Sequence, residues 1–338
     1  MKLLFILSLI CLYLISCEET FLPADFVQFQ EQVNRLEEQK RFEEALLLTK
    51  SMQDILSDYH FELIRELAYI HSKMGQTDKV FASWAQGHEL GFFFFLDSRL
   101  PQYSQYANNE KFSELEVKDR ALRAAALELS STIYEVREPY GFCPETAYPL
   151  LIVLHGGGSN LERVKEEWQS EILQSNFLTV FPRSYLHYDT RNFGWRSGDE
   201  RLRNDLKLIY EEIRNDYRIQ SENVIIAGIS AGGSMALDLA LNQVFPITGF
   251  LVICPGKPTG FSSEAVRKAA WNNLKGVMIG GENDFYLGQQ KEMSQVFQQE
   301  GLPCRFSIIS ELGHGYPDDF ESHLANAWQY LTRKATAR

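Results

Sequence analysis

The chain has 338 residues, of which 45% are hydrophobic and 13% aromatic, so it can bury more than one core and is not a largely disordered polar chain. At about 150 residues per domain, this length suggests about two domains. The formal net charge of −12 and the lack of a block of Lys and Arg argue against nucleic acid or an anionic membrane surface as the main ligand.

The N-terminal stretch MKLLFILSLICLYLISCEET has the features of an export signal. Lys2 supplies positive charge, and the apolar run from Leu3 to Ile15 is shorter than the roughly 20 residues of a membrane-spanning helix. The segment LISC, which ends at Cys17, resembles the bacterial lipobox, in which the cysteine is lipidated and becomes the first residue. The alternative is an ordinary cleaved signal that happens to contain cysteines. We expect residues 1–17 to be a lipoprotein-type signal, and the mature protein to leave the bacterial cytoplasm and be anchored at the cell envelope through lipid on Cys17.

Three further cysteines, Cys143, Cys254 and Cys304, form an odd and widely spaced set. This spacing fits neither a disulfide framework nor a zinc site. Cys254 ends the apolar run GFLVICPG and is expected to be a small buried hydrophobic residue. The sequence therefore predicts no metal site.

Residues 18–125 are expected to form a small all-α domain, because charged faces alternate with apolar stripes and only two prolines occur. Two segments about 35 residues apart resemble the tetratricopeptide repeat, a pair of packed helices. The matching positions are Phe29, Val33, Leu36, Ala45 and Met52, and then Leu67, Ala68, His71, Gly75, Val80, Trp84 and Gly87. Some other helical bundle is the alternative. Either would be a packing unit and not a catalyst, and we expect it either to shape substrate access or to offer a concave surface to a protein partner.

The run GFFFFLDSRL (91–100) contains four consecutive phenylalanines, Phe92 to Phe95. One face of a helix cannot bury four consecutive side chains, because successive residues point about 100° apart. A second surface must cover them, and we expect the following domain to supply it.

From about residue 130 the pattern changes to short apolar runs that alternate with helical segments. Strands are expected within residues 131–139, 148–156, 177–184, 223–228, 247–256, 276–281 and 304–310. Helices are expected near residues 160–174, 199–217, 231–241, 263–271, 287–301 and 318–334. This alternation predicts an α/β domain over residues 126–338, with a mostly parallel sheet, helices on both faces, and ligands at the carboxyl ends of the strands.

The segment GISAGGS (228–234) follows the strand NVIIA directly and precedes a helix. In that context G-x-S-x-G is a nucleophile elbow, a turn so tight that the positions two before and two after the serine must be small. Gly228 and Gly232 meet this requirement, and Ser230 is left as the candidate nucleophile. The N–H of Ala231 lies at the helix N-terminus, where free amides and the helix dipole favour an anion.

A serine hydroxyl needs a base that takes its proton, so the sequence should also supply an acid and then a histidine. Asp284 follows the strand GVMIGG, and His314 follows the last strand in GHGYP. Asp284 could instead cap a helix and His314 could be a solvated loop residue. Glu282 is a rival acid two residues before Asp284.

The segment LHGGGSN (154–160) follows another strand and resembles the oxyanion-hole loop of esterases. We expect Gly157 to supply a second N–H donor beside Ala231, with Gly158 as the next candidate. His155 is expected to be structural.

Together, LHGGGSN, VIIAGISAGGSMALDLAL, GGEND and GHGYP resemble the α/β-hydrolase superfamily, in particular the phospholipase/carboxylesterase, dienelactone hydrolase and polyhydroxybutyrate-depolymerase-like esterases. The resemblance covers residues from about 130 to 338. It implies hydrolysis of carboxylic esters or thioesters through an acyl-serine intermediate, without a cofactor. Relatives often carry x-V-P after the acid, whereas this chain has FYLGQQ, which puts the shape of the acyl pocket in doubt. Relatives also commonly place a tryptophan near the pocket, which makes Trp195 a candidate substrate-binding residue, with loop packing as the alternative.

The sequence thus predicts a lipid-anchored serine esterase that acts on a small-molecule or lipid-like ester. One alternative is a partner-binding lipoprotein whose hydrolase domain is only a scaffold, against which the complete Ser230, Asp284 and His314 set argues. The other is an exopeptidase on the same fold, which is disfavoured because no peptidase cap or propeller is evident.

Overall fold

A computed structural model describes residues 25–332. The expected export signal and Cys17 lie outside these described residues. The chain divides into two compact units, one up to Gln86 and one from Gly87 onward. Within residues 25–332, no helix combines the length and the apolar character needed to cross a membrane.

The first unit is built from helices that pack as successive neighbours. They are α1 (Phe26–Glu38), α2 (Phe42–Ser51), the 3-10 turn η1 (Ser57–Tyr59), α3 (His60–Lys73) and α4 (Thr77–Glu89). Asp25 caps α1 by accepting a 2.9 Å hydrogen bond from the N–H of Gln28. Two apolar clusters hold α1, α2 and α3 together, and they contain Phe29, Val33, Met52, Leu56 and Leu63, and then Ala45, Leu46, Leu67 and Ile70. The predicted helices and most of the predicted packing positions are confirmed, while the assignment to tetratricopeptide repeats stays a prediction.

Helices continue into the second unit. The 3-10 helix η2 (Pro101–Tyr106) is followed by α5 (Glu110–Leu129), which Asn109 caps with its side chain. The strands begin only at Ile133, so the change from helical to alternating structure occurs where the sequence predicted it. The division of the chain into domains at residue 125 stays a prediction.

The phenylalanine run is irregular and not helical. Phe93 and Phe94 are buried, and Phe92 and Phe95 are partly buried. The backbone of Phe93 pairs with Thr190, in the loop that follows a strand of the sheet. The expected covering surface from the sheet-containing part of the chain is therefore confirmed for Phe93.

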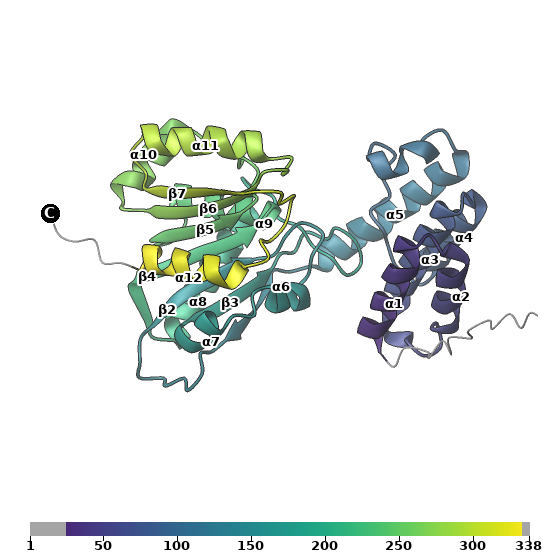
Figure 1. The fold of residues 1–338 in the computed structure, drawn as a ribbon, viewed down its shortest axis with the longest axis horizontal. Helices are drawn as coiled ribbons and strands as arrows, with labels where there is room; N and C mark the ends of the chain where they lie inside the picture. The colour runs from purple at the N-terminus through teal and green to yellow at the C-terminus, as the bar shows by residue number, and fades with distance from the viewer. Residues whose placement is uncertain (1–24, 333–338) are drawn as a thin grey trace, which may run out of the picture. The chain divides into compact units, whose positions relative to one another are not determined.

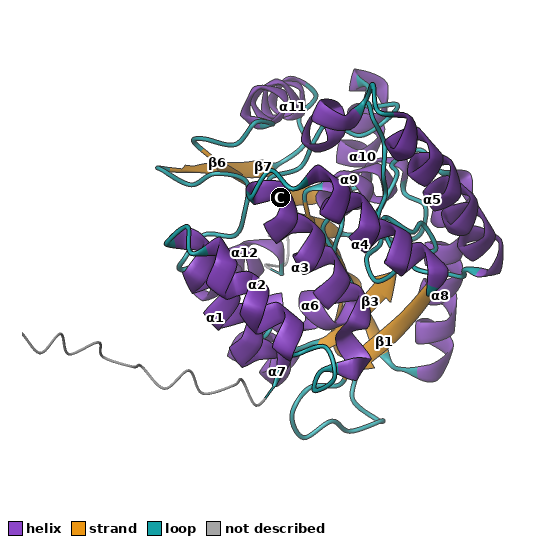
Figure 2. Ribbon diagram, turned by 90° about the vertical axis from the view of Figure 1, so that its right-hand side faces the viewer, coloured by secondary structure: helices purple, strands orange, loops and turns teal. Residues whose placement is uncertain are grey.

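The sheet has seven strands. They are β1 (Ile133–Arg137), β2 (Tyr148–Leu154), β3 (Leu178–Arg183), β4 (Ile219–Ile229), β5 (Gly249–Ile253), β6 (Lys275–Gly281) and β7 (Cys304–Ile309). Their order is β1-β3-β2-β4-β5-β6-β7, of which β2 to β7 are labelled in Figure 1. Only β1 is antiparallel, paired with β3 at the edge of the sheet (Figure 2), so the predicted mostly parallel sheet is confirmed. The strand order reverses direction between β2 and β4, and in open α/β sheets ligands bind at the carboxyl ends of strands at such a switch point.

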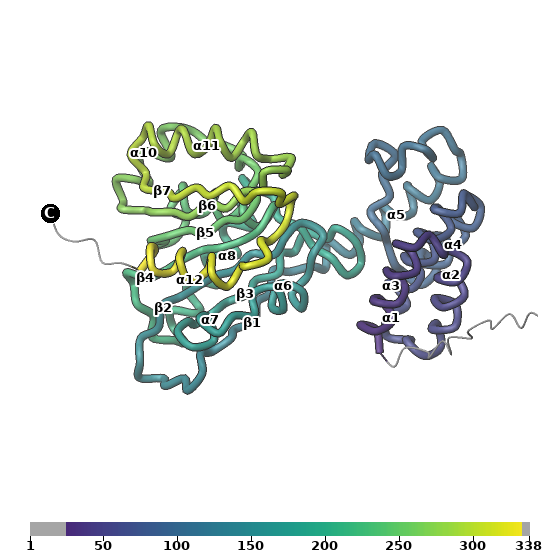
Figure 3. The backbone as a smooth tube through the Cα atoms, viewed as in Figure 1, coloured from purple at the N-terminus to yellow at the C-terminus, as the bar shows by residue number. Residues whose placement is uncertain are grey.

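Helices cover both faces of the sheet (Figure 3). One face packs on α8 (Glu200–Asp216), α9 (Ala231–Asn242), α10 (Ser263–Trp271) and α11 (Leu287–Gln299). The other packs on α6 (Leu161–Glu167), α7 (Glu171–Asn176) and α12 (Phe320–Leu331). Successive strand residues such as Ile225 and Ile226 belong to the cores on opposite faces, which explains why the central strands are apolar throughout.

The prediction of a single helix over residues 160–174 is wrong. The segment forms α6 and α7, which are separated at Trp168. Trp168 is fully buried, and Ser170 starts the second helix by accepting a hydrogen bond from the N–H of Leu173. Burial of the indole and a new N-cap therefore outweigh continued helix formation.

Candidate active site

Ser230 lies at the sharp turn between β4 and α9. Its backbone has φ +54° and ψ −119°, a left-handed conformation that is uncommon for a residue other than glycine. The turn is held on both sides, because the N–H of Ser230 donates to the carbonyl of Ile253 and the carbonyl of Ser230 accepts from the N–H of Ser234, both at 2.9 Å. Such strained residues persist where the surroundings fix them, and they occur often at active sites.

The two glycines that flank Ser230 leave no room for a side chain. A Cβ on Gly228 would lie 2.6 Å from the carbonyl carbon of Gly232, and a Cβ on Gly232 would lie 2.3 Å from the carbonyl oxygen of His155. All of these neighbours are backbone atoms. The small residues that the motif requires are therefore present for the reason predicted from the sequence, namely the close approach of strand and helix.

The glycine-rich loop after β2 lies against the start of α9. A Cβ on Gly157 would lie 3.3 Å from the Cβ of Ala231, so the two expected oxyanion-hole residues are neighbours. The N–H of Gly158 donates to the carbonyl of Phe193 at 2.9 Å, which leaves Gly157 as the better candidate of the two glycines. The first N–H groups of α9 have no carbonyl partner within the helix, as at every helix N-terminus.

His155 is fully buried and belongs to the packing of this loop. Its Nδ1 donates to the carbonyl of Gly156 at 2.7 Å, and burial lowers its pKa to about 4. The ring contacts the indole of Trp195 with centroids 5.0 Å apart. Its neutral, enclosed state agrees with the structural role expected from the sequence.

Trp195 is only 7% exposed and belongs to the core on the α8 and α9 face. The structure therefore places Trp195 in packing contact with the loop that carries Gly157. This agrees with the alternative considered from the sequence, in which Trp195 packs a loop. Direct contact with a substrate stays a prediction for this residue.

Asp284 and His314, which are 30 residues apart, meet beyond the carboxyl ends of β6 and β7. The Nδ1 of His314 donates to Oδ1 of Asp284 at 2.8 Å, and the Asp284 side chain is fully buried. Burial alone would raise the pKa of Asp284, but hydrogen bonds from the Tyr286 N–H, His314 and Gln290 outweigh it and lower that pKa. Asp284 is thus a charged, fixed partner for the imidazole.

Glu282 does not contact His314. Its carboxylate accepts from the hydroxyl of Ser310 at 2.8 Å and from the N–H of Glu311 at 3.0 Å. These bonds lower its pKa and direct it to the loop after β7. Of the two acids considered from the sequence, the geometry favours Asp284.

Two polar residues of this site were missed in the sequence. Gln290 is fully buried in α11, and its Nε2 donates to Oδ2 of Asp284 at 2.6 Å and to the carbonyl of Pro255 at 3.3 Å. A signal for it existed, because Gln290 shares the spacing of the buried Met293 and Phe297 and is the polar member of that apolar stripe.

Cys254 is the second residue that was missed, since it was expected only to fill space. It is buried, and its thiol lies 3.6 Å from the carbonyl oxygen of Gly315, beside His314. Burial raises its pKa to about 11, so the thiol is protonated at neutral pH. Among the described residues, Cys254, Asp284 and His314 are a group whose potential ligand atoms lie within 4.8 Å of one another. Because His314 and Asp284 already bond to each other, we assign no metal to this group, and the expected absence of a cofactor stays a prediction.

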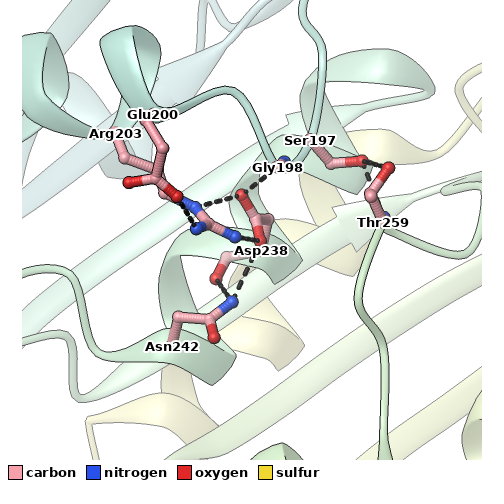
Figure 4. Close-up of polar contacts among 7 residues, drawn as sticks. All are labelled: Ser197, Gly198, Glu200, Arg203, Asp238, Asn242 and Thr259. Atoms are coloured by element: carbon pink, nitrogen blue, oxygen red, sulfur yellow. Dashed lines mark hydrogen bonds and ion pairs between the residues drawn. The ribbon is translucent and has the colours of Figure 1, made fainter.

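The loop that carries Trp195 is tied to α9 by a buried carboxylate, Asp238 (Figure 4). Asp238 accepts two hydrogen bonds from the guanidinium of Arg203, at 2.6 and 2.9 Å, and one from the N–H of Gly198 at 3.0 Å. Ser197 contacts Thr259 in the same view. Bidentate pairing of this kind fixes geometry, so α8, α9 and the Trp195 loop are held as one piece.

Comparison with known proteins agrees with this architecture. Residues 151–333 match a sequence family described as the alpha/beta hydrolase family. No curated protein sequence gave a significant match. A solved structure of an uncharacterized protein from Bacillus cereus ATCC 10987 is 21% identical, with a TM-score of 0.52, and the match covers 91% of this chain and 98% of that one.

Two solved esterase structures also resemble part of the chain. The structure of esterase PE8 is 15% identical with a TM-score of 0.47, and the match covers 60% of this chain and 99% of that one. The structure of a ferulic acid esterase is 18% identical with a TM-score of 0.46, and the match covers 60% of this chain and 92% of that one.

Proposed function

The chain belongs to the alpha/beta hydrolase family, and from this premise we propose that it is a serine hydrolase that cleaves carboxylic esters or thioesters through an acyl-enzyme on Ser230. The observation that carries the proposal is the 2.8 Å bond between His314 and the buried carboxylate of Asp284. A charged acid held on one ring nitrogen orients the other nitrogen as a base.

The proposed first step is acylation. Because Nδ1–H of His314 donates to Asp284, Nε2 is the nitrogen that can accept a proton. Nε2 takes the hydroxyl proton of Ser230 as Oγ attacks the carbonyl carbon of the ester. The resulting imidazolium is stabilised by Asp284, and it then protonates the leaving alcohol or thiol as the bond to the acyl carbon breaks.

The proposed oxyanion hole is formed by the N–H groups of Gly157 and Ala231. The negative charge that develops on the carbonyl oxygen is met by a donor from the β2 loop and one at the N-terminus of α9, where the helix dipole also favours an anion. In the second half of the cycle, His314 activates a water molecule that attacks the acyl-enzyme and releases the acid.

The test is Ser230→Ala, compared with the parent and with Ser322→Ala, which alters an exposed serine on α12. We expect Ser230→Ala to lose about 10⁴- to 10⁶-fold in kcat on short esters and to lose labelling by a fluorophosphonate probe. Ser322→Ala should behave as the parent. A Ser230→Ala protein that kept more than a few per cent of the parent activity would overturn the assignment.

The choice of acid is tested in the same assay. Asp284→Asn removes the charge that orients His314, whereas Glu282→Gln alters a carboxylate bonded to the loop at Ser310 and Glu311. A large loss of kcat should follow only the change at Asp284.

A further inference from the structure

The irregular phenylalanine run lies beside the loop that joins β3 to α8. The carbonyl of Phe93 accepts from the N–H of Thr190 at 3.1 Å, and the N–H of Phe93 donates to the hydroxyl of Thr190 at 2.8 Å. The ring of Phe93 meets the edge of His187, with centroids 5.5 Å apart. A segment that precedes the sheet by about forty residues thus holds a loop of the sheet-containing unit.

Asp119 of α5 fixes the shape of this run. Its buried carboxylate accepts from the N–H of Phe94 at 2.6 Å and from the N–H of Leu96 at 3.0 Å, and it also contacts Nε2 of His88 at 3.1 Å. Phe95, between the two held amides, has φ +60°, which is rare for a bulky residue. A strained backbone conformation of this kind persists where several surrounding contacts hold it in place, and such conformations often occur at binding sites.

In this conformation the ring of Phe95 contacts two partners. The guanidinium of Arg123 lies 4.3 Å from its ring centroid, and the ring of Tyr188 lies 4.5 Å from it with an interplanar angle of 30°. Stacking on an arginine and on a tyrosine restricts all three side chains.

Tyr188 connects this stack to the glycine-rich loop. Its ring carbons lie 3.7 Å from the position that a Cβ of Gly158 would take. The same two loops are paired through the bond from the Gly158 N–H to the Phe193 carbonyl and the bond from the Phe193 N–H to the Ser159 carbonyl. The Tyr188 side chain is nevertheless 40% exposed, so an aromatic surface borders the loop of the proposed oxyanion hole and is open to a ligand.

We propose that Tyr188, backed by Phe95 and Arg123, is a specificity-determining wall of the substrate site, and that it takes an aromatic or extended apolar group of the ester. This proposal rests on the proposed function. Gly158 presents no side chain to the Tyr188 ring, Tyr188 is 40% exposed, and the ring already packs against Phe95, so it offers an aromatic surface on which a planar group can pack. Asp119 and the phenylalanine run act through Tyr188 as positioning residues.

The test uses the full chain with Tyr188→Ala and Phe95→Gly. Glycine adopts a positive φ without strain, so Phe95→Gly removes the ring while the backbone between the two amides bonded to Asp119 is kept. Trp271→Ala is the matched control, because Trp271 is an exposed aromatic residue, 87% accessible, at the end of α10. Thermal unfolding of each variant checks that it is folded.

The first readout is selectivity. Values of kcat/KM are measured for methyl 3-phenylpropionate against methyl acetate, and for benzyl acetate against ethyl acetate, which separates the acyl side from the alcohol side. For one of these pairs, the preference for the aromatic ester should fall about fivefold or more in Tyr188→Ala and Phe95→Gly, and should stay unchanged in Trp271→Ala. If the ratio of kcat/KM values were unchanged in both ester pairs, the proposed role of Tyr188 would be wrong, while the proposed function would be unaffected.

The second readout does not need catalysis. Binding of a ketone analogue, 4-phenyl-2-butanone, and of benzyl methyl ether is measured by calorimetry in the Ser230→Ala background. If Tyr188→Ala weakens the binding of one of these ligands about fivefold or more, the proposed role of Tyr188 is supported. This holds even if the parent cleaves no ester and the proposed function fails. Equal affinity in both proteins, or no binding of either ligand, overturns the wall.

Discussion

Gly232→Ala tests how the turn at Ser230 is built. The added Cβ would lie 2.3 Å from the carbonyl oxygen of His155 and 2.4 Å from that of Leu154, both backbone atoms at the end of β2. Real Cβ atoms essentially never approach closer than 3.0 Å, so α9 and β2 would have to separate by about 0.7 Å or more in a close-packed interior.

Overpacking of a well-packed core costs about 1 to 3 kcal/mol, and the upper end applies here because neither neighbour is a side chain that can rotate away. For a unit of this size, each kcal/mol lowers Tm by about 2 to 4 °C. We therefore expect the unfolding transition of the second unit to fall by about 6 to 12 °C in scanning calorimetry, together with a loss of the proposed esterase activity.

Gly288→Ala is the matched control for this experiment. Gly288 lies in α11, has no heavy atom within 4 Å of its potential Cβ, and has no positive φ. Replacement of a helical glycine by alanine stabilises by up to about 1 kcal/mol, so its Tm should be unchanged or slightly higher. If Gly232→Ala unfolded within 2 °C of the parent, roughly the effect of less than 1 kcal/mol, the close approach would not be essential to the turn.

Two further predictions concern titrating groups. Gln290→Glu places a second carboxyl group against Asp284, and two adjacent carboxylates cannot both ionise easily, so the acid limb of the profile of kcat against pH should move to higher pH. Gln290→Met should lower kcat without moving that limb. Identical pH profiles for the parent and the variants would show that Gln290 does not act on Asp284. The pKa of His155 is lowered from 6.5 to about 4, so its contribution to the free energy of unfolding is complete above pH 6.5 and declines as the pH falls toward 4. The decline should reach up to about 3 kcal/mol in urea unfolding. His155→Asn should flatten this decline, and an equally steep decline in that variant would contradict the burial argument.

The turn at Ser230 could be predicted from the sequence because its constraints are local. A strand, a tight turn and a helix follow one another directly over residues 219–242, and the spacing of Gly228 and Gly232 results from steric contact between these adjacent elements. The same reasoning predicted the parallel sheet, since each short apolar run is followed by a helical segment.

The sequence favoured Asp284 as the acid but left Glu282 as a rival, since both follow β6 within three residues. The backbone N–H of Glu282 still pairs with the carbonyl of Ile309, as if the strand continued, whereas the N–H of Asp284 closes a turn onto Gly281. That change of direction within two residues sends one carboxylate to the loop at Ser310 and the other to His314. It depends on the register between β6 and β7, which composition and periodicity do not encode.

The phenylalanine run shows why local pattern also fails to define where a functional unit begins. By composition, residues 92–96 belong to the helical part of the chain, yet their hydrogen bonds go to Asp119 of α5 and to Thr190 in the β3–α8 loop. The buried carboxylate of Asp119 accepts from the amides on both sides of Phe95, and Phe95 has a positive φ while its ring packs against Tyr188. Each of these contacts joins residues more than twenty positions apart, so it has no periodic signal in the sequence. Because the contacts end at Gly158, next to the proposed oxyanion donor Gly157, the phenylalanine run and α5, which belong to the second unit, have a direct physical connection to the loop of the proposed site.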